Sequence, residues 1–162
     1  MRFDRPLRTE KIVQRVPRKI LGVVKLGVKT VHFWKLLEDY RFYFDDEHPN
    51  IFIFVKAGEM SDLASVPKIF GSFIQKDGPF AQPAFTHDYS YRRRGDVVWK
   101  DCPDGGIEKG WPLTRKQQDK AFLDGMEICF VGLPTRIIMW RAVRRFGWIR
   151  YPKESNDKLA KA

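Results

Sequence analysis

The sequence predicts an α+β fold in which a small antiparallel β-sheet in the N-terminal half packs against three C-terminal helices. Runs rich in β-branched and aromatic residues are concentrated before residue 56, whereas apolar residues recur at helical spacing after residue 80. The chain has 162 residues, of which 43% are hydrophobic, enough for one domain with its own core. We therefore expect a single α+β domain at residues 31–148, a basic N-terminal arm at residues 1–30 and a polar tail at residues 149–162.

The N-terminal segment, residues 1–20, is strongly basic, and Pro6 and Pro17 interrupt any helix there. This pattern predicts an extended arm that is solvated in a free monomer and lies along a neighbour in an assembly. The net charge of +10 fits an anionic partner, whether nucleic acid, anionic lipid or an acidic protein. Nucleic-acid binding rests on charge alone, because no recognised motif for it occurs. The arginines expected to contact a partner are Arg2, Arg5, Arg8, Arg141, Arg144 and Arg145.

Cysteine usage and hydropathy indicate where such a chain folds. The two cysteines, Cys102 and Cys129, lie in different contexts, one polar and one apolar, which argues against a disulfide framework. The scattered histidines give no zinc pattern. No apolar run of about 18 residues and no signal-peptide core occurs. We expect synthesis in a cytoplasm and no transmembrane segment.

Four runs before residue 56 favour strands. Residues 21–30 contain Val23, Val24, Leu26 and Val28 together with two glycines, which permit a strand or a bulged edge. Residues 31–37 and 40–44 are rich in β-branched and aromatic residues, with a Glu-Asp turn signal between them. Residues 51–55 are apolar at every position, so both faces of that strand should be covered, one of them by helices.

The segment after these strands contains turn chemistry. Asp62 or Ser65 can bond backbone amides in a turn that leads into a short helix at residues 67–73. Either side chain could instead line a pocket beside His87. Both interpretations remain open at this point.

The next helix, expected over residues 80–94, carries the principal candidate site. His87 and Tyr91 are four residues apart and share one face, while Asp88 projects about 100° around the helix from His87. Histidine is the side chain most suited to proton transfer near neutral pH. The alternative is a hydrogen-bonded histidine with a purely structural role. An arginine triplet and Gly95 end the helix.

Residues 96–111 are expected to form a long loop, either a lid or an insertion. A capping box with Thr114 and Gln117 then opens a second helix. Its apolar residues fall at helical spacing and predict the buried face. These residues are Phe122, Leu123, Met126, Cys129 and Phe130.

Asp119 lies on this buried face. A carboxylate directed at a core is costly unless it is paired, so Asp119 should have a hydrogen-bonding partner. His87 is the most economical candidate, because a carboxylate on one imidazole nitrogen leaves the other nitrogen free to act as a base. The alternative is that Asp119 faces solvent near the start of the helix.

A last helix is expected over residues 135–146, after a Gly-Leu-Pro break and before Gly147. Its buried side is predicted from four apolar residues, Ile137, Trp140, Val143 and Phe146. Its arginines form a basic rim that is either solvated or available to an anionic partner.

Four segments together resemble a bacteriophage-encoded family of unknown function. They are S-D-L-A-S-V-P at 61–67, H-D-Y-S-Y at 87–91, D-K-A-F-L-D-G-M at 119–126 and A-V-R-R-F-G-W at 142–148. The family pattern has the same order, with Thr where this chain has Ser61 and Ala where it has Gln118. The resemblance covers residues 34–148. It implies a phage gene, often located near structural genes, and supplies no activity.

The H-D-x-x-Y helix is also similar to the catalytic helix of secreted phospholipases A2. This resemblance implies that His87 activates water, that Asp119 orients the imidazole and that Tyr91 bonds the pair. Asp88 would be a calcium ligand, so calcium is the one cofactor implied. The chain lacks the flanking cysteines of those enzymes, and residues 77–83 replace their glycine-rich calcium loop.

These observations lead to two functional hypotheses. The first is a bacteriophage structural or assembly protein of the tail or head-tail region, located in the virion after synthesis in the host cytoplasm and bound to other phage structural proteins. A hydrolase-like site could accompany that role. The alternative is a phospholipase A2-like ester hydrolase that uses a His87/Asp119 dyad.

Overall fold

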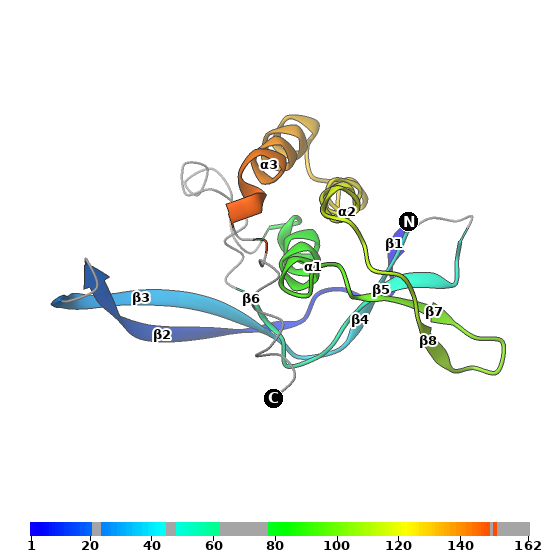
Figure 1. The fold of residues 1–162 in the computed structure, drawn as a ribbon, viewed down its shortest axis with the longest axis horizontal. Helices are drawn as coiled ribbons and strands as arrows, with labels where there is room; N and C mark the ends of the chain where they lie inside the picture. The colour runs from blue at the N-terminus through cyan, green and yellow to red at the C-terminus, as the bar shows by residue number, and fades with distance from the viewer. Residues whose placement is uncertain (21–23, 45–47, 62–77, 150, 152–162) are drawn as a thin grey trace.

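The expected α+β fold is confirmed by the computed structural model, which describes residues 1–20, 24–44, 48–61, 78–149 and 151. Antiparallel strands fill the N-terminal half, and the helices follow (Figure 1). The strands are β1 (Arg2–Phe3), β2 (Thr9–Ile20), β3 (Val24–Leu36), β4 (Tyr40–Tyr43), β5 (Ile51–Val55), β6 (Met60–Ser61), β7 (Val98–Asp101) and β8 (Ile107–Lys109). The helices are α1 (Ala81–Arg92), α2 (Arg115–Ile128) and α3 (Leu133–Phe146), and a 3₁₀ turn, η2 (Gly147–Ile149), follows α3.

The larger sheet has the strand order β1-β4-β5-β7-β8, and all its pairs are antiparallel. Successive side chains of a strand point to opposite faces, and one face of this sheet carries Phe42 and Ile53. Both are 1% exposed and pack in the same core as Phe85 of α1 and Phe122 of α2. The helices lie on this side of the sheet (Figure 1). The position of α1 is therefore fixed by the hydrophobic core.

The opposite face of the sheet is covered by cationic side chains. Tyr43, Phe52 and Trp99 lie side by side across β4, β5 and β7. The Arg41 guanidinium lies 4.4 Å from the centre of the Phe52 ring and also bonds Asp101 at 2.9 Å. A cation over an aromatic ring is favourable and keeps the ring from water. The expectation that both faces of β5 are covered is confirmed, since Phe52 is fully buried.

The smaller sheet is dominated by a long hairpin. β2 pairs antiparallel with β3 from Thr9↔Leu36 to Ile20↔Val24, with a register shift after Pro17, which has no N–H to donate. The hairpin extends well beyond the helices and the larger sheet (Figure 1). Among the described residues, only its base is tied to another strand, where β6 pairs with Trp34 and Lys35. The segment expected as a basic arm, residues 1–30, is therefore extended, but it contains β1, all of β2 and the start of β3.

The first eight residues are not a solvated tail. β1 pairs with β4, and the Phe3 ring lies 4.8 Å from the Phe42 ring. The Gln82 amide donates a 2.9 Å hydrogen bond to the Arg5 carbonyl, which joins this segment to α1. The physical reason is the single aromatic side chain at position 3, which extends the core beyond β4.

The prediction that residues 96–111 form a lid or an insertion is wrong. They contain the β7–β8 hairpin, which extends the edge of the larger sheet. Its turn is closed by two hydrogen bonds, from the Cys102 N–H to the Gly106 carbonyl and from the Gly105 N–H to the Cys102 carbonyl, and Gly105 has a φ of 84°. Such a φ suits glycine, and the Asp-Gly-Gly sequence is a hairpin signal. The strands are only four and three residues long, which hid them in the sequence.

Two predicted core residues are exposed. The capping box of α2 is confirmed, but Phe130 is 94% exposed, because the helix ends at Ile128 and Phe130 has a φ of 57°. In α3, Phe146 is 52% exposed. Three residues of an α-helix fall about 60° short of a full turn. The three such steps from Ile137 to Phe146 add up to about 180°, so these two side chains lie on opposite sides of the helix. The residues of α3 that are buried are Met139, Ala142 and Val143.

The short helix expected at residues 67–73 lies outside the described residues, as do Asp62 and Ser65. Within the ranges that the structure describes, no helix is both long enough and apolar enough to cross a membrane.

Gly95 fixes the turn between α1 and β7. Its φ is +80°, and its N–H donates a 2.9 Å hydrogen bond to the Ser90 carbonyl at the end of α1. A Cβ atom at this position would lie 2.0 Å from the Leu113 carbonyl oxygen. Both the conformation and the close approach therefore require glycine.

We predict that Gly95→Ala lowers the free energy of unfolding by about 3 kcal/mol or more, because strain and a backbone clash combine. Gly58 is the matched control, since its φ is +84° but nothing lies within 4 Å of its Cβ position. Gly58→Ala should cost only about 1 kcal/mol. Urea unfolding of both variants measures the difference, and equal losses would show that the contact with Leu113 has no role.

Candidate functional site

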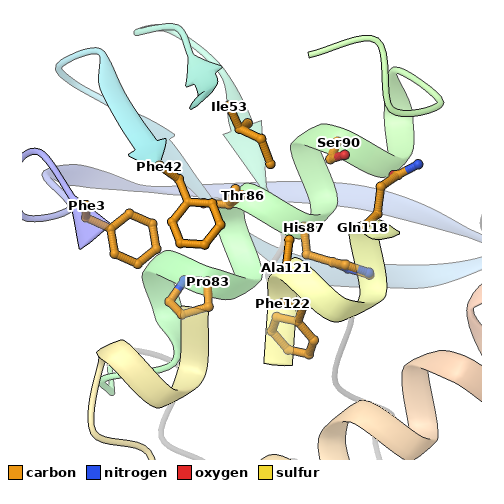
Figure 2. Close-up of a pocket in the computed structure, with 10 residues that line it drawn as sticks. All are labelled: Phe3, Phe42, Ile53, Pro83, Thr86, His87, Ser90, Gln118, Ala121 and Phe122. Carbon is orange, nitrogen blue, oxygen red and sulfur yellow. The ribbon is translucent and has the colours of Figure 1, made fainter. Parts of the chain in front are cut away.

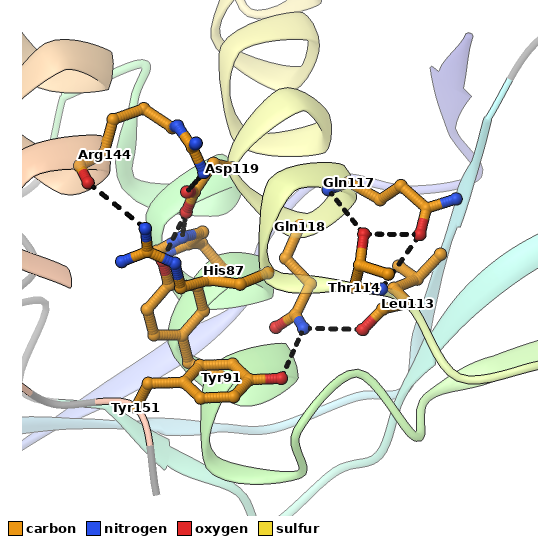
Figure 3. Close-up of polar contacts among 10 residues, drawn as sticks. His87, Tyr91, Leu113, Thr114, Gln117, Gln118, Asp119, Arg144 and Tyr151 are labelled. Carbon is orange, nitrogen blue, oxygen red and sulfur yellow. Dashed lines mark hydrogen bonds and ion pairs between the residues drawn. The ribbon is translucent and has the colours of Figure 1, made fainter. Parts of the chain in front are cut away.

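The candidate site lies where the three helices meet. α1 supplies His87 and Tyr91, α2 supplies Asp119 and α3 supplies Arg144 (Figure 3). His87 is 4% exposed and Asp119 is fully buried. The four side chains come from segments that are far apart in the sequence, so only the packing of the helices brings them together.

Asp119 is the centre of the site. Its Oδ1 atom lies 3.0 Å from His87 Nε2 and also accepts a hydrogen bond from the Tyr91 hydroxyl. Its Oδ2 atom accepts a 2.7 Å hydrogen bond from Arg144. The predicted contact between Asp119 and His87 is therefore present. The alternative, in which Asp119 faces solvent, is wrong.

The hydrogen bonds determine the charge of this carboxylate. Burial by itself would raise the pKa of Asp119, but the hydrogen bonds from His87, Tyr91 and Arg144 together hold that pKa below its ordinary value. Burial, reinforced by the carboxylate of Asp119, raises the pKa of Tyr91. Asp119 is thus ionised near neutral pH, and Tyr91 is a neutral donor.

The ionised carboxylate also determines the His87 tautomer. Because Asp119 can only accept, the proton of the neutral imidazole must be on Nε2, which leaves Nδ1 as an acceptor. Within the described part of the chain, Nδ1 is buried and has no hydrogen-bond partner. His87 is one of the residues that line a cavity of about 10 Å³ between α1, α2 and the larger sheet (Figure 2).

Aromatic packing holds the imidazole in place. The His87 ring centre is 4.0 Å from that of Tyr91 and 4.9 Å from that of Phe122. Tyr91 in turn meets Tyr151 edge to face at 5.1 Å. A Cβ atom on Gly147 would lie 2.7 Å from the Tyr91 hydroxyl oxygen, so the turn after α3 also confines this ring.

Asp88, the expected calcium ligand, accepts a 2.5 Å hydrogen bond from the Ser61 hydroxyl. Among the described residues, no group of three or more His, Cys, Asp or Glu side chains is arranged to hold a metal ion. Calcium requires six to eight oxygen ligands. The described side chains do not supply such a set.

The six arginines expected to bind a partner differ in their surroundings. Arg144 is not part of a solvated rim, because it is paired with Asp119. Arg2 lies over the Tyr43 ring at 5.1 Å, and Arg5 and Arg8 form ion pairs with Asp4 and Glu38. The remaining two, Arg141 and Arg145, are exposed on α3.

Sequence reasoning missed Arg144, Ser90 and Gln118 as members of this region. Ser90 and Gln118 are each 1% exposed and line the cavity beside His87. Ser90 follows His87 by three residues, which places both on one side of α1 and was a usable signal. Arg144 gave no such signal, since several arginines of α3 were equivalent in the sequence.

We predict that Asp119→Asn lowers the free energy of unfolding by about 3 kcal/mol, because it removes the charge that satisfies Arg144 and the donors of α1. Asp124→Asn is the matched control on the same helix. Asp124 pairs with the exposed Lys120, so its loss should cost no more than about 0.5 kcal/mol. Similar losses in the two variants, measured by urea unfolding, would contradict a special role for Asp119.

The lowered pKa of Asp119 predicts an acid-sensitive contribution to stability. The unfolded chain binds a proton at this carboxyl more readily than the folded chain, so acidification favours unfolding. The stabilisation is complete above about pH 5 and decreases as the pH falls through the ordinary titration range of a carboxyl group and below it. The stability difference between the native protein and Asp119→Asn should therefore shrink over that interval. Urea unfolding at a series of pH values tests this, and a constant difference would refute it.

Comparison with known proteins gives one match. No curated protein and no solved structure matches this chain. The model of a family described as "Protein of unknown function (DUF1353)" matches residues 34–143. The matched segment includes His87, Tyr91 and Asp119, and it begins at the base of the β2–β3 hairpin. Because the match covers more than half of the chain, the protein belongs to the DUF1353 family of proteins of unknown function.

Proposed function

We propose that this protein is a bacteriophage structural or assembly component, of the tail or head-tail region, whose β2–β3 hairpin binds a neighbouring subunit in the virion. The observation that carries this proposal is the length and isolation of the hairpin. In the described part of the chain, β2 pairs only with β3, and β3 meets a further strand only at its base. A two-stranded hairpin alone is at best marginally stable in water. A neighbouring subunit would supply the missing contacts.

The hairpin is suited to an acidic partner. Residues 9–36 contain seven lysines and arginines and a single glutamate. Val13, on the same hairpin, is 56% exposed. β2 is also an edge strand, whose unpaired backbone groups can pair with a strand of another chain. Charge would guide the encounter, and strand pairing with apolar contact would hold the complex.

The buried site supports the same role. Asp119 links three helices through charged hydrogen bonds, and a cavity of about 10 Å³ has no room for an ester substrate. A network of this kind stiffens the body that carries the hairpin. The motifs shared with the phage-encoded family would then be retained for the architecture of the helices.

The primary test is the composition of the particle and the role of the hairpin in it. Mass spectrometry of virions purified from the encoding phage should detect the protein, and its absence would refute a virion component. Lys11→Glu combined with Arg15→Glu should reduce incorporation into particles at least tenfold, because both side chains are exposed on β2.

Lys56→Glu combined with Lys116→Glu is the matched control, since it makes the same change in charge at exposed positions on the body. This control should assemble normally. Equal defects in both variants would show that net charge, rather than the hairpin, determines assembly. Circular dichroism of both variants verifies that the fold is intact.

One observation favours a second function, ester hydrolysis. His87 presents an unpartnered Nδ1 while Asp119 holds its Nε2, which is the arrangement of a general base and its orienting carboxylate. In such a reaction, Nδ1 would take a proton from water, and the hydroxide oxygen would bond to the ester carbonyl carbon. The ester C–O bond would then break, and the imidazolium would return the proton to the departing alkoxide. Substrate access would require the helices to separate at the cavity.

If this second function holds, His87→Ala should lower kcat at least a hundredfold on phospholipid vesicles or on a nitrophenyl ester, because the base is lost. His32→Ala is the control, since His32 is exposed on the hairpin. Assays with and without added calcium test whether the rate depends on a metal. No turnover by the native protein, with phage infectivity unaffected by His87→Ala, would eliminate the hydrolase.

A further inference from the structure

Three buried polar atoms belong to residues that line one cavity between α1 and α2. They are His87 Nδ1, Ser90 Oγ and Gln118 Oε1, and none has a hydrogen-bond partner among the described residues. His87 and Ser90 come from α1 and Gln118 comes from α2 (Figure 2). The three residues are 4%, 1% and 1% exposed, so bulk water does not satisfy these atoms. An unsatisfied buried polar atom costs about 1–3 kcal/mol, and three at one place require a common explanation.

We propose that these three atoms form a binding site for a single buried water molecule. The hydrogen-bonding capacities match. His87 Nδ1 is an acceptor because Nε2 carries the proton, and Gln118 Oε1 is an amide acceptor. The Ser90 hydroxyl can donate. One water donates to the imidazole and to the amide, and it accepts from the serine.

The assignment of the Gln118 amide follows from its other bonds. Gln118 Nε2 donates to the Leu113 carbonyl at 2.9 Å and contacts the Tyr151 hydroxyl at 3.2 Å (Figure 3). A carbonyl can only accept, so the nitrogen of the amide must face Leu113. The oxygen is thereby the atom left without a described partner.

The size and lining of the cavity select water over larger ligands. Its volume of about 10 Å³ is near the minimum for one water molecule, and buried waters typically have two to four polar partners. The rest of the lining is largely apolar, with Phe42, Ile53 and Phe122. These three side chains offer the water no hydrogen-bonding partner. The water thus joins the Asp119 network through His87 and extends it to Ser90.

This inference depends on neither proposed function. In a structural protein the water completes the link between α1 and α2. In a hydrolase the same water would be the molecule whose proton His87 accepts. A bound water at this site is therefore compatible with both functions, and the assembly and turnover assays distinguish them.

The experiment combines water relaxation dispersion, which detects long-lived buried waters, with thermal unfolding of Ser90→Ala. If the water is bound, Ser90→Ala removes its donor, so the dispersion amplitude should fall and the unfolding midpoint should decrease. If no water is bound, Ser90→Ala removes an unsatisfied buried hydroxyl, so the midpoint should stay or rise with the dispersion unchanged. The second outcome would overturn the proposal.

Thr86→Val is the matched control. Thr86 also lines the cavity, but its hydroxyl is already engaged by the Tyr40 hydroxyl at 2.8 Å and the Gln82 carbonyl at 3.0 Å. Its loss should lower the midpoint without changing the dispersion amplitude. A high-resolution crystal structure gives an independent readout, with one water peak expected within hydrogen-bonding distance of all three atoms. A dry cavity there would also refute the site.

Discussion

The structure depends on one buried negative charge. Asp119 is fully removed from solvent, and a carboxylate in that position is tolerable only when donors surround it. Those donors come from α1 and α3, so the charge requires both helices to pack on α2 in one arrangement. Hydrophobic burial alone would allow several ways of packing three helices on a sheet. The carboxylate is satisfied in one of them.

The same requirement limits what the site can do. A His/Asp pair is the chemical core of many general-base sites, but its use depends on what can reach the free nitrogen. Here His87, whose Nδ1 has no partner among the described residues, lines a cavity of about 10 Å³ together with Ser90 and Gln118. The geometry of a dyad and the accessibility of a dyad are separate properties. Because this cavity is too small for an ester substrate, we propose an architectural role ahead of hydrolysis.

The hairpin and the helical body are stabilised in different ways. The body has a continuous core that extends from β4 and β5 to α2 and α3, whereas the outer part of the hairpin has only its own two strands in the described residues. A strand pair without a core gains little from burial. The charge and exposed edge of the hairpin are therefore better explained by a contact with another molecule than by the stability of the monomer.

The sequence by itself determined the fold class, the helix with His87, the capping box at Thr114 and the pairing of Asp119 with His87. These features depend on local periodicity, on local hydrogen bonds, or on the rule that a buried charge needs a partner. The sequence did not reveal the β7–β8 hairpin, because its strands are too short to establish a period. The sequence pattern predicted that Phe130 and Phe146 are buried, because the spacing of apolar residues does not show where a helix ends or which of its faces packs on the core. Only the tertiary structure chose Arg144 from several similar arginines and brought Ser90 and Gln118 to one cavity, since those contacts depend on how separate helices pack.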